Sequence, residues 1–378
     1  MKKGMKFMLK KENYYYDIKK DIEKYPNATF IFVVGGRNTG KTYSSLSFCL
    51  DYCSGFTFCK RTNEDVELLC SDLKSIKKGS EEVTINVDLS PFKSINRDRL
   101  INIKAFSVPK AKGVGVFCKC DDENIPLTGD PIAYALSLNA VKKIKGFDLS
   151  DMSDVQIFDE FIPMLGERVR RTEGESLLDL YKTIIRDREH RGKQPMKLLC
   201  LANAITISNP VFSTFEIVDD VAEMVLHGKD TLYIEDRQIL IRILENNPLF
   251  DEVEHNSALY KAMGQTAWGH VAFNNEFAYD DFTNVKKRSL KGYSCICRLD
   301  YKKKDYYIYR REDGRYYMTR TRTRYYKYSY DLDSISERRR FFQECWCQLN
   351  MAIIERMFDF ETFGMFDIIF NYREMFKY

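Results

Sequence analysis

Three short apolar runs in the first half of the chain are typical of strands that are buried on both faces. Residues 29–34 (TFIFVV) are β-branched and aromatic with almost no polar break. Residues 154–161 (DVQIFDEF) and 196–204 (MKLLCLANA) contain similar runs. Continuous apolar strands belong to parallel sheets that carry helices on both faces. The pattern therefore predicts an α/β domain with a central, mostly parallel sheet.

Two segments have apolar residues at the spacing of a helix: one follows the first of these strands, and the other precedes the third. Residues 42–52 (TYSSLSFCLDY) repeat apolar positions every three or four residues, and residues 174–193 do the same. The apolar face of the second predicted helix consists of Leu177, Leu178, Tyr181, Ile184 and Ile185. Arg186, Arg188 and Arg191 fall near its end, where positive charge suits the helix dipole. A solvated helix end explains these arginines; the alternative is an arginine finger that reaches a neighbouring subunit's ATP.

Composition sets limits on the class of protein. The chain has 378 residues, 44% of them hydrophobic, which is enough for two domains with separate cores. The net charge is only +4, so a basic surface must be local. No apolar run approaches the roughly 18 residues of a membrane span, and the basic N-terminus lacks the apolar region of a secretory signal. The eleven cysteines are scattered through a long charged chain, which favours reduced thiols in a cytoplasm.

A phosphate-loop pattern lies between the first strand and the first helix. It consists of Gly35, Gly36, Arg37, Asn38, Thr39, Gly40, Lys41 and Thr42. The glycines allow successive backbone N–H groups to point at an anion, and the helix adds its positive N-terminus. In this pattern the lysine reaches the β- and γ-phosphates of ATP, and the threonine hydroxyl binds Mg²⁺. The strand–loop–helix context favours a nucleotide site over a plain glycine-rich turn.

Two acidic residues stand at the end of the second strand, where open α/β sheets place their ligands. We expect Asp159 to hold Mg²⁺ and Glu160 to orient and deprotonate the attacking water. Asn203 ends the third strand. Its side chain either hydrogen-bonds the γ-phosphate or only begins the turn into Ser208-Asn209-Pro210, and the sequence does not separate these alternatives.

Taken together, these motifs resemble the DNA-packaging ATPases of phi29-like phages. The resemblance is carried, in order, by VVGGRNTGKTY, QIFDEF, IIRDREHR and LCLANAITISNPVF, and it covers roughly residues 29–218. It implies a phosphate-loop ATPase of the ASCE, terminase-like class. It also implies a homo-oligomeric ring, expected to be a pentamer, in the host cytoplasm. The ring would sit at the portal of a procapsid, pump double-stranded DNA inward and use ATP with Mg²⁺, without a membrane.

The resemblance also implies roles for three residues. Arg186 matches the trans-acting finger, and Asn203 matches a polar sensor. Arg37 matches a loop arginine that contacts the catalytic glutamate or a phosphate. With the loop, Asp159 and Glu160, these residues complete the site that we expect.

The composition changes beyond the resemblance. Residues 1–218 are the expected ATPase domain, and 219–263 a linker or lid. Within it, the apolar positions of residues 232–263 suit two or three short helices broken at Asn247-Pro248. In residues 286–327 there are 15 basic and 4 acidic residues, a net charge of +11, with nine tyrosines interleaved. Apolar and polar residues alternate over several parts of this stretch, and the sequence EDGR is typical of a hairpin turn. Together they predict an antiparallel sheet with a basic face. A solvated face is one explanation; the other is contact with nucleic acid, with tyrosine covering sugars or stacking.

The final domain, 264–378, leaves the question of nuclease activity open. A nuclease of ribonuclease-H type needs clustered carboxylates for two metal ions. Asp280, Asp281, Asp300 and Asp305 form no arrangement that the sequence identifies as such a site. The resemblance implies a degenerate nuclease fold that keeps a nucleic-acid surface, in some relatives beside a structural RNA. A terminase with an active nuclease, or an ATPase switch that binds RNA, are the alternatives.

Overall fold

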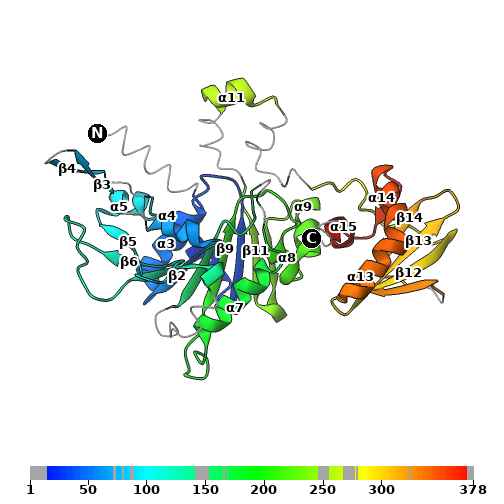
Figure 1. Cartoon of the computed structure of the whole chain (residues 1–378), viewed down its shortest axis with the longest axis horizontal. Helices are drawn as coiled ribbons and strands as arrows, with labels where there is room; N and C mark the ends of the chain where they lie inside the picture. Colours follow the sequence, from blue (N-terminus) through cyan, green and yellow to red (C-terminus); the bar gives the residue numbers. More distant parts are fainter. Residues whose placement is uncertain are drawn as a thin grey trace. The chain divides into compact units, whose positions relative to one another are not determined.

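The chain folds into two compact units, each with its own sheet (Figure 1). The first unit contains Met1–Phe215 and Met224–Tyr279, and the second contains Glu216–Glu223 and Asp280–Tyr378. The computed structural model describes residues 15–70, 74–78, 81–85, 89–140, 153–164, 167, 169–245, 255–266, 277, 280–322 and 325–372. Within these residues, no helix combines the length and the apolar character that a membrane crossing requires.

A large sheet forms the centre of the first unit, and the predicted α/β fold is confirmed. Its strands, in spatial order, are β10 (Thr231–Ile234), β11 (Ile239–Ile243), β1 (Phe30–Val34), β9 (Lys197–Ala202), β8 (Val155–Asp159), β2 (Phe56–Lys60), β7 (Ala133–Ser137), β6 (Val114–Lys119) and β5 (Ile103–Ser107). From β11 to β7 all neighbours are parallel, and β10, β6 and β5 add antiparallel edges. The carboxyl ends of β1, β9, β8 and β2 therefore meet at one edge of the sheet.

Helices cover both faces of this sheet, which explains the continuous apolar strands. Four of them share one apolar core with the strands: α2 (Ile18–Lys24), α3 (Lys41–Tyr52), α4 (Asn63–Leu69) and α5 (Lys93–Arg99). On β1, Ile31 and Val33 face that core. Phe30 and Phe32 instead pack against Tyr181 of α7 (Glu173–Ile185) and Phe212 of α8 (Pro210–Thr214). Alternate side chains of one strand thus supply two separate cores.

The prediction of helices in residues 232–263 is wrong for its first half. Thr231–Ile243 forms the strands β10 and β11, and β11 pairs in parallel with β1 along its whole length. Short apolar runs do not distinguish strand from helix by themselves, and here pairing with a buried strand decides the outcome. A helix is present further on, at α11 (Ala258–Met263), while Asn247-Pro248 lies outside the described residues. The domain limits at 218 and 263 stay predictions.

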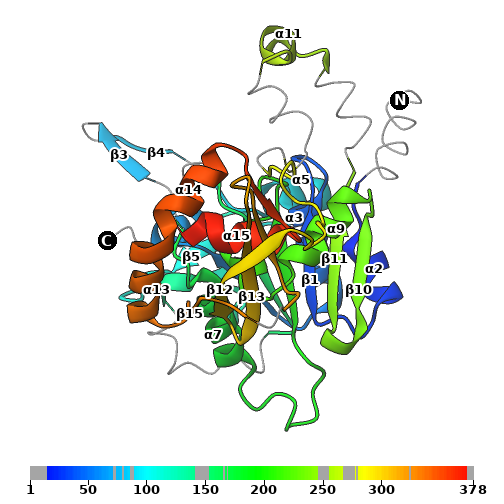
Figure 2. The same cartoon turned by 90° about the vertical axis from the view of Figure 1, so that its right-hand side faces the viewer.

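The second unit contains a five-stranded sheet whose middle is antiparallel, as predicted (Figure 2). Its spatial order is β15 (Tyr328–Asp331), β12 (Tyr293–Tyr301), β13 (Lys304–Arg311), β14 (Tyr316–Thr319) and β16 (Phe358–Phe360). β15 is parallel to β12, and β16 is parallel to β14. The apolar core of the unit joins the sheet to α13 (Ile335–Phe341), α14 (Cys347–Ile354) and α15 (Phe363–Tyr372). The last helices of the chain therefore back this sheet.

Smaller elements complete the described chain. They are the two-stranded ribbon of β3 (Lys74–Lys78) and β4 (Glu81–Ile85), and helix α9 (Val218–Leu226), which begins within the second unit. In that unit, Asp219 of α9 accepts a hydrogen bond from the backbone N–H of Gly364 at 2.6 Å. Residues 216–223 are therefore part of the fold that residues 280–378 build.

Candidate nucleotide site

The loop between β1 and α3 has the geometry that its glycines predict. A Cβ atom on Gly35 would lie 2.6 Å from Cβ of Leu244, which follows β11, so only glycine fits there. Gly40 stands at the start of α3 with φ of 88°, a left-handed conformation that suits glycine. Asn38 also has a positive φ, of 61°, which asparagine tolerates. The loop therefore curls back at the N-terminus of α3, where backbone N–H groups favour anions.

Lys41 is buried inside this loop. Its amine donates hydrogen bonds to the carbonyl oxygens of Gly35 at 3.0 Å and Gly36 at 2.6 Å, and to Oγ1 of Thr39 at 3.1 Å. Burial lowers the pKa of Lys41 to about 8, although the charge of Asp159 opposes the shift. The loop thus holds a desolvated cation whose charge an anion would stabilise.

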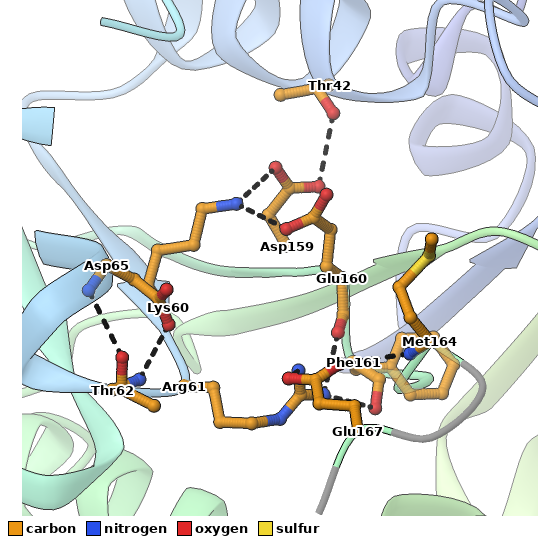
Figure 3. Close-up of polar contacts among 10 residues, drawn as sticks. All are labelled: Thr42, Lys60, Arg61, Thr62, Asp65, Asp159, Glu160, Phe161, Met164 and Glu167. Carbon is orange, nitrogen blue, oxygen red and sulfur yellow. Dashed lines mark hydrogen bonds and ion pairs between the residues drawn. The ribbon is translucent and has the colours of Figure 1, made fainter. Parts of the chain in front are cut away.

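The two sequence-predicted Mg²⁺ ligands meet in the structure. Thr42 Oγ1 donates a hydrogen bond to Asp159 Oδ1 at 3.2 Å, from the first turn of α3 to the last residue of β8 (Figure 3). The Asp159 side chain is only 15% exposed. A hydroxyl and a carboxylate oxygen are the hard oxygen ligands that Mg²⁺ prefers, together with waters and substrate phosphates. The pair fits a Mg²⁺ ion bound along with a nucleotide.

Glu160, the predicted base, follows Asp159 in a left-handed conformation with φ of 62°. For a glutamate this backbone conformation is strained, and such strain is concentrated at functional sites. Its carboxylate is 67% exposed and lies 3.0 Å from the amine of Lys60, which is also 3.2 Å from Asp159 Oδ2. Figure 3 shows the amine pointing to both carboxylates. Burial would lower the pKa of Lys60, but the two carboxylates prevail and raise it.

Arg61 holds the backbone of this edge in place. Its guanidinium donates to Glu173 at 2.7 Å, to Glu167 at 2.7 Å and to the carbonyl oxygen of Glu160 at 2.9 Å. Burial raises the pKa of Glu173 even though Arg61 beside it acts in the opposite direction. Lys60 and Arg61 were not predicted from the sequence. The available signal was FTFCKRT, an apolar strand with two cations at its end, which resembles many exposed strand ends.

Two of the remaining predicted residues lie near the loop. Asn203 follows β9, whose last carbonyl, of Ala202, accepts a hydrogen bond from the Gly35 N–H at 3.2 Å. Asn203 is thus placed beside the start of the loop. The exposed side chain of Arg37 approaches the sulfur of Met164 at 4.0 Å. The contact of Arg37 with the glutamate or a phosphate, which the resemblance implies, stays a prediction.

Arg186 lies near the amino ends of the strands, whereas the phosphate loop lies at their carboxyl ends. Helix α7 begins at Glu173, beside Arg61, and ends before Arg186, which has φ of 37°. The next arginine, Arg188, is buried and donates to the carbonyl oxygen of Ser153 at 3.0 Å, just before β8. Since a five-residue strand spans roughly 17 Å, Arg186 is well separated from the loop of its own chain.

The basic stretch of the second unit surrounds a buried carboxylate. Asp359 of β16 is fully buried, and its Oδ2 accepts hydrogen bonds from Arg288 at 2.8 Å and Arg315 at 3.2 Å. The amine of Lys286 lies 3.7 Å from Oδ1. These three cations keep 25–44% of their side chains exposed. One buried negative charge therefore gathers three positive groups at the surface, a net surplus that suits phosphates.

The tyrosines of this stretch behave differently from the prediction. The fully buried ones are Tyr307, Tyr309, Tyr316 and Tyr317. They pack within the unit and are not available to stack on bases. Tyr325, by contrast, is 85% exposed. Alternation along the strands does not show which tyrosines other residues of the unit cover, and this burial results from the tertiary structure.

The four aspartates considered for a nuclease do not converge. Asp300 and Asp305 are partners across β12 and β13, and the guanidinium of Arg298 pairs with both, at 3.3 Å and 2.6 Å. Asp281 accepts a hydrogen bond from the Thr283 N–H at 2.8 Å in a local turn. Among the described residues, no group of three or more His, Cys, Asp or Glu side chains could hold a metal ion. Asp300 and Asp305 are instead neutralised by the guanidinium of Arg298.

Comparison with known proteins places the chain among phage proteins. It is 29% identical over 169 residues to the "DNA packaging protein" of Bacillus phage B103, which covers 43% of this chain and 46% of that protein. It is 26% identical over 164 residues to the protein of the same name from Bacillus phage phi29, covering 43% and 45%. The chain thus matches less than half the length of these relatives.

Two solved structures and one family model also match. The structures are the crystal structure of the Gp16 C-terminal domain from Bacillus virus phi29, with 15% identity and a TM-score of 0.21, and an NMR structure of the C-terminal domain of the phi29 ATPase, with 16% and 0.20. They cover 25% and 26% of this chain and 95% and 97% of those chains. The family model of the Podovirus DNA encapsidation protein (Gp16) matches residues 123–358, more than half of the chain. This chain therefore belongs to the Podovirus DNA encapsidation protein (Gp16) family.

Proposed function

We propose that this protein is an ATP-driven translocase that packages double-stranded phage DNA into a preformed procapsid. The observation that carries the proposal is the meeting of Thr42 and Asp159 at 3.2 Å, with Glu160 next along the chain. It unites the phosphate-loop helix with the acidic end of β8, as hydrolysis of a bound nucleoside triphosphate requires. Family membership supports DNA packaging as the process that this hydrolysis serves.

Each residue of the site has a separate task in this proposal. Lys41 binds the β- and γ-phosphates of ATP, and Thr42 with Asp159 holds Mg²⁺, which would neutralise charge on the phosphates. Glu160 orients the attacking water and accepts its proton. Lys60, paired with Glu160 at 3.0 Å, orients that carboxylate.

The strand order supports the additional-strand (ASCE) class of phosphate-loop ATPases. β9 lies between β1, which precedes the loop, and β8, which carries Asp159 and Glu160. Asn203, at the end of β9, is placed between loop and acid, where a polar sensor of the γ-phosphate would act.

A ring of identical subunits is the second part of the proposal. Arg186 is separated from the phosphate loop of its own chain by the length of β8, so its action as a finger requires a neighbour. A pentamer at the portal of the procapsid, in the host cytoplasm, is the arrangement that we propose on the basis of the family resemblance.

The second unit is proposed to contact nucleic acid through charge. Lys286, Arg288 and Arg315, held around Asp359, supply phosphate contacts that carry no sequence information. A degenerate nuclease fold agrees with Arg298 pairing with Asp300 and Asp305. A structural RNA would meet the same cations, since it presents the same phosphates as DNA.

The test is a packaging assay with the full chain, procapsids, linear DNA and ATP. We expect DNA to become protected from DNase only when ATP is present, and ATP hydrolysis to rise on addition of DNA. Glu160→Gln should abolish both effects. An ATP hydrolysis rate that DNA does not change, together with no protected DNA, would contradict the proposal. Mg²⁺-dependent nicking of plasmid would favour a nuclease-bearing terminase.

A further inference from the structure

Residues 16–18, which lead into α2 and begin it, are hydrogen-bonded to the phosphate loop before Gly40 and to α3 after it. The Tyr16 N–H donates a hydrogen bond to the carbonyl oxygen of Thr39 at 3.0 Å. Two residues later, the Ile18 N–H donates to Oγ of Ser44 at 2.9 Å, in the first turn of α3. These bonds fix the position of the segment relative to the loop.

Tyr15 covers the loop directly. A Cβ atom on Gly40 would lie 3.0 Å from Cδ1 of the Tyr15 ring and 3.3 Å from its Cβ, so the ring is in contact with the Gly40 backbone. Even so, Tyr15 remains 38% exposed. A large aromatic side chain thus lies against a phosphate-loop glycine and still reaches solvent.

A second tyrosine stands at the same place. Tyr43 follows Thr42 in the first turn of α3 and is also 38% exposed. Burial raises the pKa of both Tyr15 and Tyr43, and the carboxylate of Asp98 adds to the shift in each case. Tyr43 thus belongs to the same end of α3 as Gly40, which Tyr15 covers.

The metal pair determines the direction in which a nucleotide must extend. Thr42 and Asp159 mark the γ-phosphate end, on the side of β8, and the loop amides hold the phosphates behind it. The segment with Tyr15 passes the N-terminal end of α3 and leads into α2. There Asp21 of α2 accepts a hydrogen bond from Tyr16 at 2.8 Å and pairs with Arg242 of β11 at 3.5 Å. The sugar and base of a bound nucleotide would continue from the α-phosphate away from Asp159, and Tyr15 is an exposed aromatic side chain beside the loop that holds the phosphates.

We infer that the ring of Tyr15 stacks on the base of the bound nucleotide. The inference rests on the proposed function, since it needs a nucleoside triphosphate in the loop. An aromatic ring offers a π-face, and every nucleobase has one, so stacking adds affinity with little choice of base. Tyr15 therefore strengthens binding of nucleotides in general and does not select adenine over guanine.

The test compares ligands with and without a base, bound to the full chain in the presence of Mg²⁺. The ligands are AMP-PNP, GMP-PNP and inorganic tripolyphosphate, with binding measured by calorimetry. We expect Tyr15→Ala to weaken both nucleotides by about 5- to 150-fold, the range for loss of one base–aromatic stack, and to leave tripolyphosphate nearly unchanged. Tyr15→Phe keeps the ring and should bind all three ligands as the parent does. The control is Tyr52→Ala, at the opposite end of α3, where the tyrosine is 58% exposed.

Three results would overturn the inference. Equal weakening of tripolyphosphate and the nucleotides would mean that the ring only shapes the loop through Gly40. No weakening by Tyr15→Ala would mean that no base contact exists. Loss of AMP-PNP alone would indicate an edge contact that selects adenine. Lys41→Ala tests the proposed function separately from the stacking by Tyr15. If this variant still binds all three ligands as the parent does, the loop is not the phosphate site and the proposed function is contradicted.

Discussion

The amine of Lys60 lies 3.0 Å from the carboxylate of Glu160, and the two residues come from neighbouring strand ends, β2 and β8. Lys60 is 14% exposed, whereas Glu160 is 67% exposed. The buried partner therefore limits the orientations of the exposed one. A general base must point at its water within hydrogen-bond reach, so this pair bears directly on the rate of hydrolysis.

Replacement of the amine should slow hydrolysis more than it weakens binding. We expect Lys60→Met to lower kcat at least about 10-fold, since a misplaced catalytic group commonly costs about that much or more, with little change in affinity for AMP-PNP. Steady-state ATPase assays and calorimetry measure the two effects. Lys119→Met, at the exposed end of β6, is the matched control. An unchanged kcat would show that Lys60 does not position Glu160.

Removal of the base itself should separate binding from chemistry. We expect Glu160→Gln to bind ATP but to hydrolyse it at least about 100-fold more slowly, as for loss of a general base. Lys41→Ala should instead weaken nucleotide binding. Glu175→Gln, on the exposed side of α7, should behave as the parent does. Normal turnover by Glu160→Gln would remove Glu160 from this role.

Nucleotide binding should be accompanied by proton uptake above pH 8. Burial lowers the pKa of Lys41 to about 8, from an ordinary value of 10.5, so at pH 8.5 the free protein carries Lys41 mostly as the neutral amine. Phosphates beside the amine favour its charged form and raise its pKa, so binding must add a proton. Calorimetry of AMP-PNP binding at pH 8.5, in buffers with different ionisation enthalpies, measures this uptake.

The size of the proton uptake should depend on pH. At pH 6.5 Lys41 is already protonated in the free protein, so its contribution should disappear. The weak residual binding of Lys41→Ala should show no such contribution at either pH. Equal proton uptake by the parent and by Lys41→Ala at pH 8.5 would assign it to another group.

Subunit mixing can test whether Arg186 acts in trans. We expect Arg186→Ala to fold and to bind ATP but to lose hydrolysis that depends on assembly, since such fingers contribute roughly 10³–10⁵ in rate. A charge at a helix end contributes only about 0.3–1 kcal/mol, and to stability. Mixed rings of Arg186→Ala and Glu160→Gln contain some interfaces with both residues intact, so part of the activity should return. Rings that demonstrably mix yet stay inactive at every ratio would exclude action in trans.

Binding of nucleic acid by the second unit should depend on salt. The logarithm of affinity for duplex DNA should fall linearly with the logarithm of salt concentration, with a slope of about −0.9 per phosphate contacted. Arg288→Ala combined with Arg315→Ala should reduce the slope by up to about 2. Lys229→Ala, exposed in the first unit, is the control. The full chain is the appropriate material, because residues 216–223 belong to the second unit and a fragment from 264 onward lacks them.

The features that could be predicted from the sequence are those that depend on residues close together in the chain. The phosphate loop occupies eight successive residues between a strand and a helix, and both neighbours follow from periodicity, so the loop from Gly35 to Thr42 could be predicted. Asp159 and Glu160 could be placed because the end of a buried strand in a parallel sheet is a known location for ligands. The antiparallel hairpins of the second unit followed from alternation and from Gly314, which has φ of 87°.

The remaining features depend on contacts between residues far apart in the chain and could not be predicted from the sequence. β10 and β11 became strands because β1 offered a buried edge to pair with, a choice that their short apolar runs leave open. Lys60 became part of the site because β2 lies next to β8, and no local pattern sets the order of strands. Tyr307 and Tyr309 are buried because residues further along the chain cover them: Tyr307 lies beside Tyr326, and Tyr309 donates a hydrogen bond to the carbonyl oxygen of Thr321. Local chemistry is encoded in neighbouring residues, whereas strand order and burial result from the packing of the whole unit.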